Sequence, residues 1–549
     1  MAKVQPTEEE LTAAQAASQH AVNSVRHTVY SNNRANEFAE YQARYPDWKP
    51  YADAVTPDIS FQEYRDKFSD IDAGARLPEL GTFTLCGRIS TKREASNKLY
   101  FIDIVGNDAG VSQIPLQVIC STRNMSESGF DLSPLVKKGD WIAVTGYPGK
   151  SKTNELSIIA TDLKLLTPCL QLVPQKLTDP NIRFRNRHLD LIVNQAHTWD
   201  IFRTRTTIFS ALRQFLAARG FVEVETPILW PIAGGATARP FVTTSNAFGN
   251  NMALNLRIAP ELFLKQLVIG GMERVFELSK VFRNEGIDAT HNPEFTSCEL
   301  YMAHADSNTM MDFTEELLKH LVQAATGGLT VALPSGHADP SAGAATALHD
   351  PAAAKTAGVE LNYIDFSQPF ARLDVIDTLR AHGIELPENY NEPEAVPALR
   401  RICEERGWEV SAPFTNARLM DKMIGEVIEP MCVQPTFIVN HPVCLSPLAK
   451  QHRSRPGLTE RFELFIGTKE YCNAYSELNV PAEQYHRLVR QQELRNADGE
   501  GHDNEAHPLD TPFCEALEYG LPPTGGWGLG VDRRSEEHTS ELQSHHDLV

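Results

Sequence analysis

The stretch RVFELSKVFRNEGIDATHNPEFTSCELY, residues 274–301, decides the fold that this sequence predicts. Its first half alternates residue types with a period of two, as a half-buried β-strand does. Phe276, Leu278 and Phe282 fall on one face, and Arg283 and Glu285 fall on the other. We therefore predict a strand that presents charged side chains on one side of a sheet.

A loop and a return strand complete an antiparallel hairpin in this interpretation. Gly286 and Asp288 are typical of a loop, and Asn292-Pro293 is typical of its exit. The return strand would carry its polar and aromatic residues on a single face. These residues are Phe295, Ser297, Glu299 and Tyr301.

The same period-two grouping of polar residues returns in KQHRSRPGLTERFELFIGTKEYCNAYSELN, residues 450–479. There Asn473, Tyr475 and Glu477 share one strand face. A surface hairpin with solvated charges is the plain alternative for any one of these residues. The repeated pattern favours two strands that face one polar site.

Three motifs in this order resemble those of class II aminoacyl-tRNA synthetases. FRNEGIDATHNPEFTSCELY (282–301) resembles motif 2, in its details that of the lysyl-tRNA synthetase family; FVEVETPIL (221–229) resembles motif 1, and GWGLGVDR (526–533) resembles motif 3. The resemblance implies an α+β fold. It consists of an N-terminal five-stranded β-barrel of the OB type, followed by a catalytic domain in which helices flank an antiparallel sheet.

Composition limits the classes of protein that this chain can belong to. Of its 549 residues, 42% are hydrophobic and 22% are charged, which is typical of a soluble globular protein. The net charge of −20 argues against a protein that coats nucleic acid without specificity. Nine scattered cysteines without a CxxC pair indicate reduced thiols, and MAKVQPTEEE has no apolar signal core. We expect a cytoplasmic protein.

The chain divides into segments of different character. Residues 1–78 are expected to be an extension, partly disordered and then helical. Residues 79–168 contain five short β-rich runs separated by turn residues, which favours an OB-type barrel, a common reader of single-stranded nucleic acid. Residues 169–200 are expected to be a hinge.

The remaining segments belong to the predicted catalytic domain, residues 201–533. Within it, residues 326–360 are rich in Ala, Gly, Pro and Ser and predict a low-complexity insertion. The polar string at 534–549 does not continue motif 3 as an apolar helix, and we interpret it as a non-native tail. By resemblance, the helix–strand unit at 201–229 would form a homodimer interface.

The resemblance also implies roles for single residues in the barrel. Phe101 would stack on the central anticodon base and Gln117 would hydrogen-bond to it, with Arg88 or Arg93 on a phosphate. Stacking a base on an aromatic ring contributes about 1–3 kcal/mol. Periodicity alone favours a core position for Phe101, so only the resemblance assigns it to the anticodon of tRNA(Lys).

In the catalytic domain the resemblance implies a site for ATP, lysine and Mg²⁺. Its catalytic residues would be Arg283, Glu285 and Arg533. Its ATP ligands would be Arg283, Glu285, His291, Asn292, Phe295, Glu470 and Arg533. Its lysine ligands would be Gly235, Glu261, Arg283, Glu299, Tyr301, Asn473, Tyr475, Glu477 and Gly528. Its magnesium ligands would be Glu463 and Glu470.

Charge supports lysine as the amino acid, because a buried ammonium needs a paired carboxylate. Glu477 and Tyr301 match the positions that hold the side-chain amine, and an aspartyl enzyme would need a cation where Glu477 lies. We expect a lysine–tRNA ligase that forms lysyl-adenylate and transfers lysine to the 3′ end of tRNA(Lys). The alternatives are an aspartyl- or asparaginyl-tRNA synthetase relative and a non-catalytic, synthetase-like RNA-binding protein. An amide ligase is disfavoured by the barrel.

Overall fold

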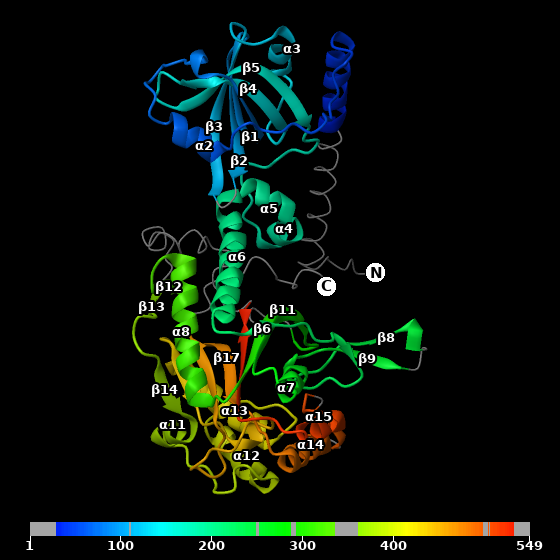
Figure 1. The fold of residues 1–549 in the computed structure, drawn as a ribbon, viewed down its shortest axis with the longest axis vertical. Helices are drawn as coiled ribbons and strands as arrows, with labels where there is room; N and C mark the ends of the chain where they lie inside the picture. Colours follow the sequence, from blue (N-terminus) through cyan, green and yellow to red (C-terminus); the bar gives the residue numbers. More distant parts are fainter. Residues whose placement is uncertain are drawn as a thin grey trace, which may run out of the picture. The chain divides into compact units, whose positions relative to one another are not determined.

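The computed structural model divides the chain into two compact units, residues 1–200 and 201–549 (Figure 1). None of the helices in the described part of the chain is long and apolar enough to cross a bilayer. The structure describes residues 29–108, 111–248, 252–286, 292–334, 361–497, 503 and 505–531.

The first unit contains a closed five-stranded barrel, which confirms the expected OB-type architecture. Its strands follow the spatial order β1-β2-β3-β5-β4. Their interior side chains form one apolar core, to which Leu85, Val118 and Ile158 contribute with no exposed area. The strands are β1 (Phe83–Ser96), β2 (Leu99–Asp108), β3 (Val111–Ser121), β4 (Trp141–Lys150) and β5 (Leu156–Thr167), with the helix α3 (Glu127–Leu132) between β3 and β4.

Two helices ahead of the barrel pack their aromatic side chains on its core. One includes residues 29–44 and contributes Phe38 and Tyr41, while α2 (Phe61–Phe68) contributes Tyr64. Ser60 begins α2 with a capping box, in which its hydroxyl accepts from the backbone amide of Glu63. These contacts make the segment part of the barrel unit.

The segment expected as a hinge at 169–200 is largely helical. It contains α4 (Pro180–Arg185), α5 (Arg187–Val193) and the start of α6 (Gln195–Ala217). The buried carboxylate of Asp190 fixes the first two helices, because it accepts from Arg183 Nε at 2.8 Å and from Arg187 Nη1 at 3.0 Å. Two basic residues of this segment, Arg183 and Arg187, therefore form internal ion pairs with Asp190.

The second unit is built on an eight-stranded mixed sheet with the order β14-β15-β16-β17-β18-β11-β10-β6. The expected antiparallel arrangement holds for its interior, whereas the edge pairs β14·β15 and β10·β6 are parallel. The strands are β6 (Val222–Glu223), β10 (Arg274–Phe282), β11 (Glu294–Ala303), β14 (Ala371–Asp374), β15 (Thr436–Val439), β16 (Arg461–Ile466), β17 (Lys469–Ser476) and β18 (Thr524–Gly530).

Helices cover the back of this sheet and leave its front for the polar residues. Cys298 and Leu300 of β11 pack in one core with Leu212 of α6 and Leu317 of α8 (Ser307–Thr326). Trp527 of β18 joins this core and donates its indole N–H to Thr314 Oγ1 at 2.9 Å. The period-two pattern of the sequence therefore separates an apolar back face from a polar front face.

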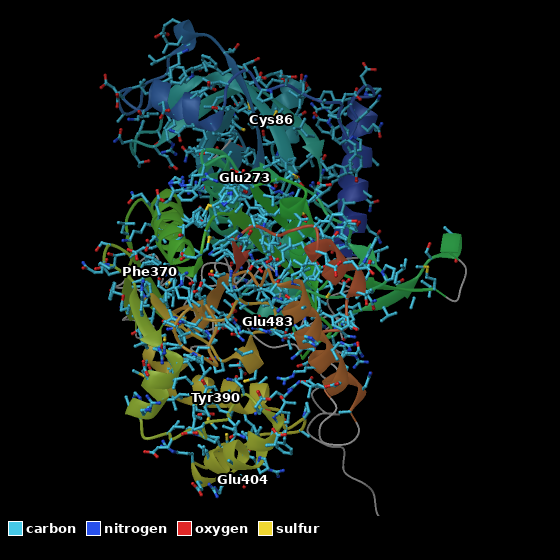
Figure 2. The ribbon with its side chains drawn as sticks, turned by 60° about the horizontal axis from the view of Figure 1, so that its bottom comes forward. Cys86, Glu273, Phe370, Tyr390, Glu404 and Glu483 are labelled. Atoms are coloured by element: carbon cyan, nitrogen blue, oxygen red, sulfur yellow. The ribbon has the colours of Figure 1, made fainter. Side chains whose placement is uncertain are left out.

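The remaining helices form two groups around the sheet. The first group has its own core, and Figure 2 labels Tyr390 and Glu404 in this yellow part of the chain. It comprises α11 (Val375–Ala381), α12 (Val396–Glu405) and α13 (Asn416–Val427). The second group comprises α7 (Glu261–Ile269), α14 (Pro481–Asn496) and α15 (Thr511–Leu517). Short 3₁₀ helices are η1 (Pro78–Leu80), η2 (Asn246–Phe248), η4 (Pro393–Ala395), η5 (Glu429–Met431) and η6 (Val443–Leu445).

Two small sheets complete the unit. The strands β7 (Leu229–Trp230), β9 (Ala253–Leu256) and β8 (Val242–Thr244) form an arm that projects from the rest of the unit in Figure 1. The strand β12 (Thr330–Pro334) pairs with β13 (Leu361–Asp365). The segment 326–360, expected as a low-complexity insertion, thus includes the end of α8 and the whole of β12. Residues 335–360, the tail at 534–549 and residues 1–28 lie outside the described residues.

A buried ion pair ties the predicted motif 1 segment to the central hairpin. Arg257 Nη1 lies 2.6 Å from Glu277 Oε1, and Glu277 Oε2 accepts the hydroxyl of Thr226 at 2.6 Å. The long strand expected at 221–229 is reduced to β6 and β7, with this cluster between them. Glu277, which by alternation shares a strand face with Arg283, does not line the cavity and instead stabilises the framework through this ion pair.

Removing the guanidinium of this cluster should destabilise the catalytic unit. In R257M, Glu277 would keep a buried charge without its cation, which costs about 3–5 kcal/mol. We expect a clearly lower melting temperature for the second unit in differential scanning calorimetry. The matched control is R401M, because the Arg401–Glu405 pair at 3.7 Å is largely exposed and contributes about 1 kcal/mol or less. Equal melting temperatures for both variants would contradict this account.

Candidate active site

A cavity of about 290 Å³ lies on the front of the central sheet. It is walled by strands β11, β16, β17 and β18, by the start of α7 and by residues 235–237 and 445–449. The cavity brings together many of the residues that the sequence predicted for one site. These are Gly235, Glu261, Arg283, Phe295, Glu299, Tyr301, Glu463, Glu470, Asn473, Tyr475 and Gly528.

Other predicted residues do not line the cavity. Glu285 and Asn292 lie on the loop side of the β10–β11 hairpin, outside the cavity wall. Glu477 lies just beyond the end of β17 and is 1% exposed, so it is beneath the wall rather than in it. His291 and Arg533 lie outside the described residues.

The centre of the site follows from strand register. Glu299 of β11 faces Gly528 of β18, which in turn faces Asn473 of β17. Because three neighbouring strands are antiparallel and in register here, residues from sequence positions far apart share one face. The glycine between the two polar residues leaves the space that they enclose.

One end of the cavity combines a cation with an aromatic ring. The guanidinium carbon of Arg283 lies 5.1 Å from the ring centroid of Phe295, and Arg283 Nε donates to the carbonyl of Ile258 at 3.5 Å. A guanidinium next to a flat apolar ring suits a ligand that has both an anionic group and a planar base.

The other end of the cavity is acidic and closed. Glu261 is the first residue of α7, and its Oε1 accepts the hydroxyl of Tyr475 at 2.7 Å. The ammonium of Lys265, one turn further along α7, lies 2.6 Å from the same oxygen and 2.5 Å from Glu477 Oε2. The sequence analysis missed Lys265, although its i,i+4 spacing from Glu261 inside an apolar helix was a usable signal.

Burial shapes the protonation of this acidic end. Burial, together with the charge of Glu261, raises the pKa of Glu299 to about 8. Burial likewise raises the pKa of Glu477, with Lys265 opposing it. Burial lowers the pKa of Lys265, but the neighbouring carboxylates outweigh it and the pKa is raised, so this ammonium stays charged. The carboxylates of Glu261 and Glu477 thus share one internal cation, Lys265, which favours a cationic ligand.

Two carboxylates on the cavity wall fit the expected magnesium donors. Burial raises the pKa of Glu463, but Arg461 at 2.5 Å and His441 at 3.2 Å hold it at about 2, so the group is ionised. Glu470 lines the same wall. No cluster of three His, Cys, Asp or Glu side chains that could hold a metal occurs among the described residues. A metal here would need further oxygen ligands, such as phosphates.

Two more residues of the cavity wall escaped sequence analysis. Arg461 donates from Nε to Asn473 Oδ1 at 3.0 Å, and its place two residues before Glu463 on one strand was a readable signal. His507 lies in a loop without periodicity and offered no such signal. Burial and the nearby Lys265 and Arg495 lower the pKa of His507 to about 4, so it is neutral.

The predicted anticodon residues lie in the barrel unit. Phe101 is partly exposed beside Arg93, whose guanidinium carbon is 5.8 Å from its ring centroid. Gln117 is 3% exposed, and its amide donates to Glu155 Oε2 at 2.9 Å. Its side chain is therefore already engaged, and Glu155 is a neighbour that the sequence analysis missed. Arg88 packs on Trp141, at 5.1 Å.

Comparison with protein-family models yields two matches. Residues 179–539 match the model described as class II tRNA synthetases (D, K and N). Residues 83–166 match the model of the OB-fold nucleic acid binding domain. The first match covers most of the sheet unit together with α4 and α5, and the second covers the barrel.

Curated relatives cover most of the chain. A lysine–tRNA ligase (cla4) of Cladosporium cladosporioides is 41% identical over 513 residues, which is 91% of this chain and 80% of the relative. A probable cytoplasmic lysine–tRNA ligase of Encephalitozoon cuniculi is 44% identical over 452 residues, 81% of this chain and 82% of the relative. A lysine–tRNA ligase of Thermotoga maritima is 40% identical over 490 residues, 88% of each chain.

The raised pKa of Glu299 predicts a pH-dependent cost in stability. A buried carboxyl with a raised pKa favours folding while it is protonated, and this contribution is lost as the pH rises from its ordinary value toward 8. The isosteric, neutral variant E299Q should therefore have the melting temperature of the parent near pH 5. Toward pH 8 it should melt at a higher temperature than the parent, because its free energy of unfolding exceeds that of the parent by up to about 1.4 kcal/mol more for each pH unit. Thermal melts of the ligand-free protein between pH 5 and 9 measure this. The control is E426Q on α13, where no pH-dependent difference is expected; parallel curves for E299Q would refute the assignment.

Proposed function

The chain belongs to the class II tRNA synthetases of the aspartate, lysine and asparagine group, and we propose that it ligates lysine to tRNA(Lys) with ATP. The observation that carries this proposal is the acidic end of the cavity, where the two carboxylates of Glu261 and Glu477 share the single buried ammonium of Lys265. A second, cationic amine restores the balance of charge, and lysine supplies it.

Glu477 is suited to hold the side-chain ammonium of the substrate. Its Oε1 accepts no hydrogen bond from the described residues, although the side chain has no exposed area. A Cβ added to Gly526, which lines the cavity, would overlap this oxygen. Glycine at this position thus lets the carboxylate lie directly against the cavity, and the phenol of Tyr301 lies beside it.

Glu261 and Gly235 are suited to hold the α-amino group. Glu261 uses Oε1 for Tyr475 and Lys265, which leaves Oε2 for a ligand. Gly235 has a φ of +93°, and a Cβ there would lie 3.0 Å from that of Glu261. Its backbone therefore packs directly against the side chain of Glu261. In this proposal Glu299, Asn473, Tyr475 and Gly528 shape the rest of the lysine pocket.

The opposite end of the cavity would take ATP. Arg283 would bridge the substrate carboxylate and the α-phosphate, and Phe295 would stack on adenine. Glu285, His291, Asn292 and Arg533 complete the proposed nucleotide contacts, as the family resemblance implies. The lysine carboxylate then attacks the α-phosphorus and pyrophosphate leaves, after which a terminal ribose hydroxyl of the tRNA takes the lysyl group and AMP leaves.

In this reaction the protein contributes position and charge more than covalent chemistry. Arg283 neutralises the repulsion between the two anions that must meet. Glu463 and Glu470 would hold Mg²⁺, which supplies further neutralisation of the phosphates when it is bound. The partners that hold Glu463 ionised, Arg461 and His441, would keep it ready for this role.

The barrel would select the tRNA through its anticodon. Phe101 with Arg93 offers an aromatic face and a cation, the two features that single-stranded nucleic acid requires. Gln117, held by Glu155 and Ser157, would read a base edge only after its amide exchanges a partner. Arg88 is a second proposed phosphate contact.

We propose a homodimer that forms through the helix–strand unit at 201–229. Large apolar side chains are exposed in its strand part, including Val222 at 51%, Ile228 at 45% and Leu229 at 47%. An exposed apolar surface of this kind marks a protein interface. We also propose a cytoplasmic location, because the Encephalitozoon relative is named as a probable cytoplasmic enzyme.

The rival functions fit the site less well. An aspartyl or asparaginyl relative would need the pocket to accept a neutral or anionic side chain, but Lys265 is already shared by two carboxylates. A non-catalytic RNA-binding protein would have no use for a closed acidic pocket beside an arginine and an aromatic ring. Both rivals predict no lysine-dependent exchange.

Lysine-dependent ATP–pyrophosphate exchange tests the proposal directly. We expect exchange with lysine and none with aspartate or asparagine. In E477Q the lysine KM should rise at least roughly thirtyfold, because a buried charge-assisted contact to the ammonium is lost. The control E404Q, on the exposed surface of α12, should behave as the parent. Exchange with aspartate instead of lysine would overturn the specificity, and retained tRNA binding without any exchange would favour the RNA-binding rival.

The anticodon assignment has a separate test. F101A should raise the KM for tRNA(Lys) by about 5- to 150-fold in aminoacylation, the equivalent of a lost stacking contact of 1–3 kcal/mol. Lysine-dependent exchange, which needs no tRNA, should remain unchanged. F83A, which removes a partly buried ring packed on the same barrel core, serves as control for loss of barrel packing. An unaltered tRNA KM in F101A would remove Phe101 from the interface.

A further inference from the structure

A buried lysine lies between the two carboxylates that the proposed function assigns to the two amines of the substrate. Lys265 has no exposed area, and its ammonium lies 2.6 Å from Glu261 Oε1 and 2.5 Å from Glu477 Oε2. The rings of Tyr475 and Phe513 enclose it at 5.6 and 5.7 Å. Lys265 does not line the cavity, so it acts on a ligand only through its partners.

We propose that Lys265 is a positioning residue: its ammonium keeps Glu261 and Glu477 ionised and at a fixed spacing, so that one lysine molecule meets both at once. The inference rests on the proposed function and concerns how that site selects its amino acid. A single nitrogen that contacts both carboxylates ties α7 to the end of β17, and the distance between the two amine subsites follows from this contact.

The geometry of the contacts shows that Lys265 and a ligand need not compete. Lys265 approaches Glu477 on Oε2, whereas Oε1 accepts no hydrogen bond from the described residues and abuts Gly526 on the cavity wall. Glu261 likewise uses Oε1 for Lys265. Each carboxylate therefore has one oxygen for the internal ammonium and one for the substrate.

Charge gives the second reason for this role. Two buried carboxylates that lie close together repel each other, and each loses hydration. Without the ammonium, at least one of them would take up a proton and could no longer accept from a substrate ammonium. Glu261, Glu477, Tyr475 and His507 interact with Lys265, and Glu299 and Tyr301 of β11 interact with its two carboxylate partners.

The test replaces Lys265 with methionine in the full chain and measures ATP–pyrophosphate exchange. We expect the lysine KM of K265M to rise roughly tenfold or more, the range for loss of a contact to a buried charge. The ATP KM should stay within about twofold, because Arg283 and Phe295 lie at the other end of the cavity. The control is K319M on α8, which removes the same i,i+4 contact, Lys319 to Glu315 at 2.7 Å, away from the site.

A pH profile separates positioning from a general loss of structure. Removing the ammonium should raise the pKa of the two carboxylates, so the lysine KM of K265M should fall as the pH rises from 6.5 to 8.5, more steeply than in the parent. A lysine KM that is unchanged or lowered would overturn the proposal, the latter because Lys265 would then compete with the substrate. Equal rises of the lysine and ATP KM without this pH slope would also overturn it.

The experiment also covers a variant that does not fold and a parent protein that is inactive. If K265M does not fold, K265Q takes its place, since an amide still donates to both carboxylates but carries no charge; the same KM and pH criteria apply. If the unaltered chain shows no lysine-dependent exchange, the proposed function fails. An active parent with an unaffected Lys265 variant contradicts only this inference.

Discussion

Buried carboxylates need cations, and this requirement organises the catalytic unit. Glu277 is compensated by Arg257, which ties the motif 1 segment to the central hairpin. Glu261 and Glu477 share Lys265, which ties α7 to the end of β17. The first carboxylate is fully compensated and belongs to the framework. The second pair, with Glu299 nearby, is compensated only in part, and that deficit is what a cationic substrate can fill.

The space for a substrate comes from a strand that is nearly without side chains on one face. In TGGWGLG of β18, Trp527 and Leu529 point into the core, while Gly526 and Gly528 point to the cavity. A Cβ at Gly526 would overlap Glu477, and one at Gly528 would reach Glu299 at 3.6 Å. Because β18 lies between β11 and β17, its glycines form the floor on which the polar residues of both neighbours converge.

The sequence was sufficient for the parts of this arrangement that obey a period. The hairpin, the five-stranded barrel and the polar face of β17 followed from alternation, and the resemblance then placed Glu261, Arg283 and Glu299 in one site. Sequence reasoning failed where a side-chain contact depends on how two distant segments pack against each other. By alternation Glu277 shares a strand face with Arg283, yet it pairs with Arg257 and accepts from Thr226. The resemblance assigns Gln117 to an anticodon base, yet its amide already donates to Glu155.

Lys265 shows why charge in such a pocket must be counted over all neighbours. A lysine inside an amino-acid site would on its own suggest an anionic substrate. Here two carboxylates contact the same nitrogen, and a third lies close enough to raise the pKa of its neighbours. The net charge of this end of the pocket is therefore negative even though a fully buried ammonium lies within it. A pocket with a buried lysine can thus still select a basic amino acid, because the lysine compensates only one of the two carboxylates that contact it.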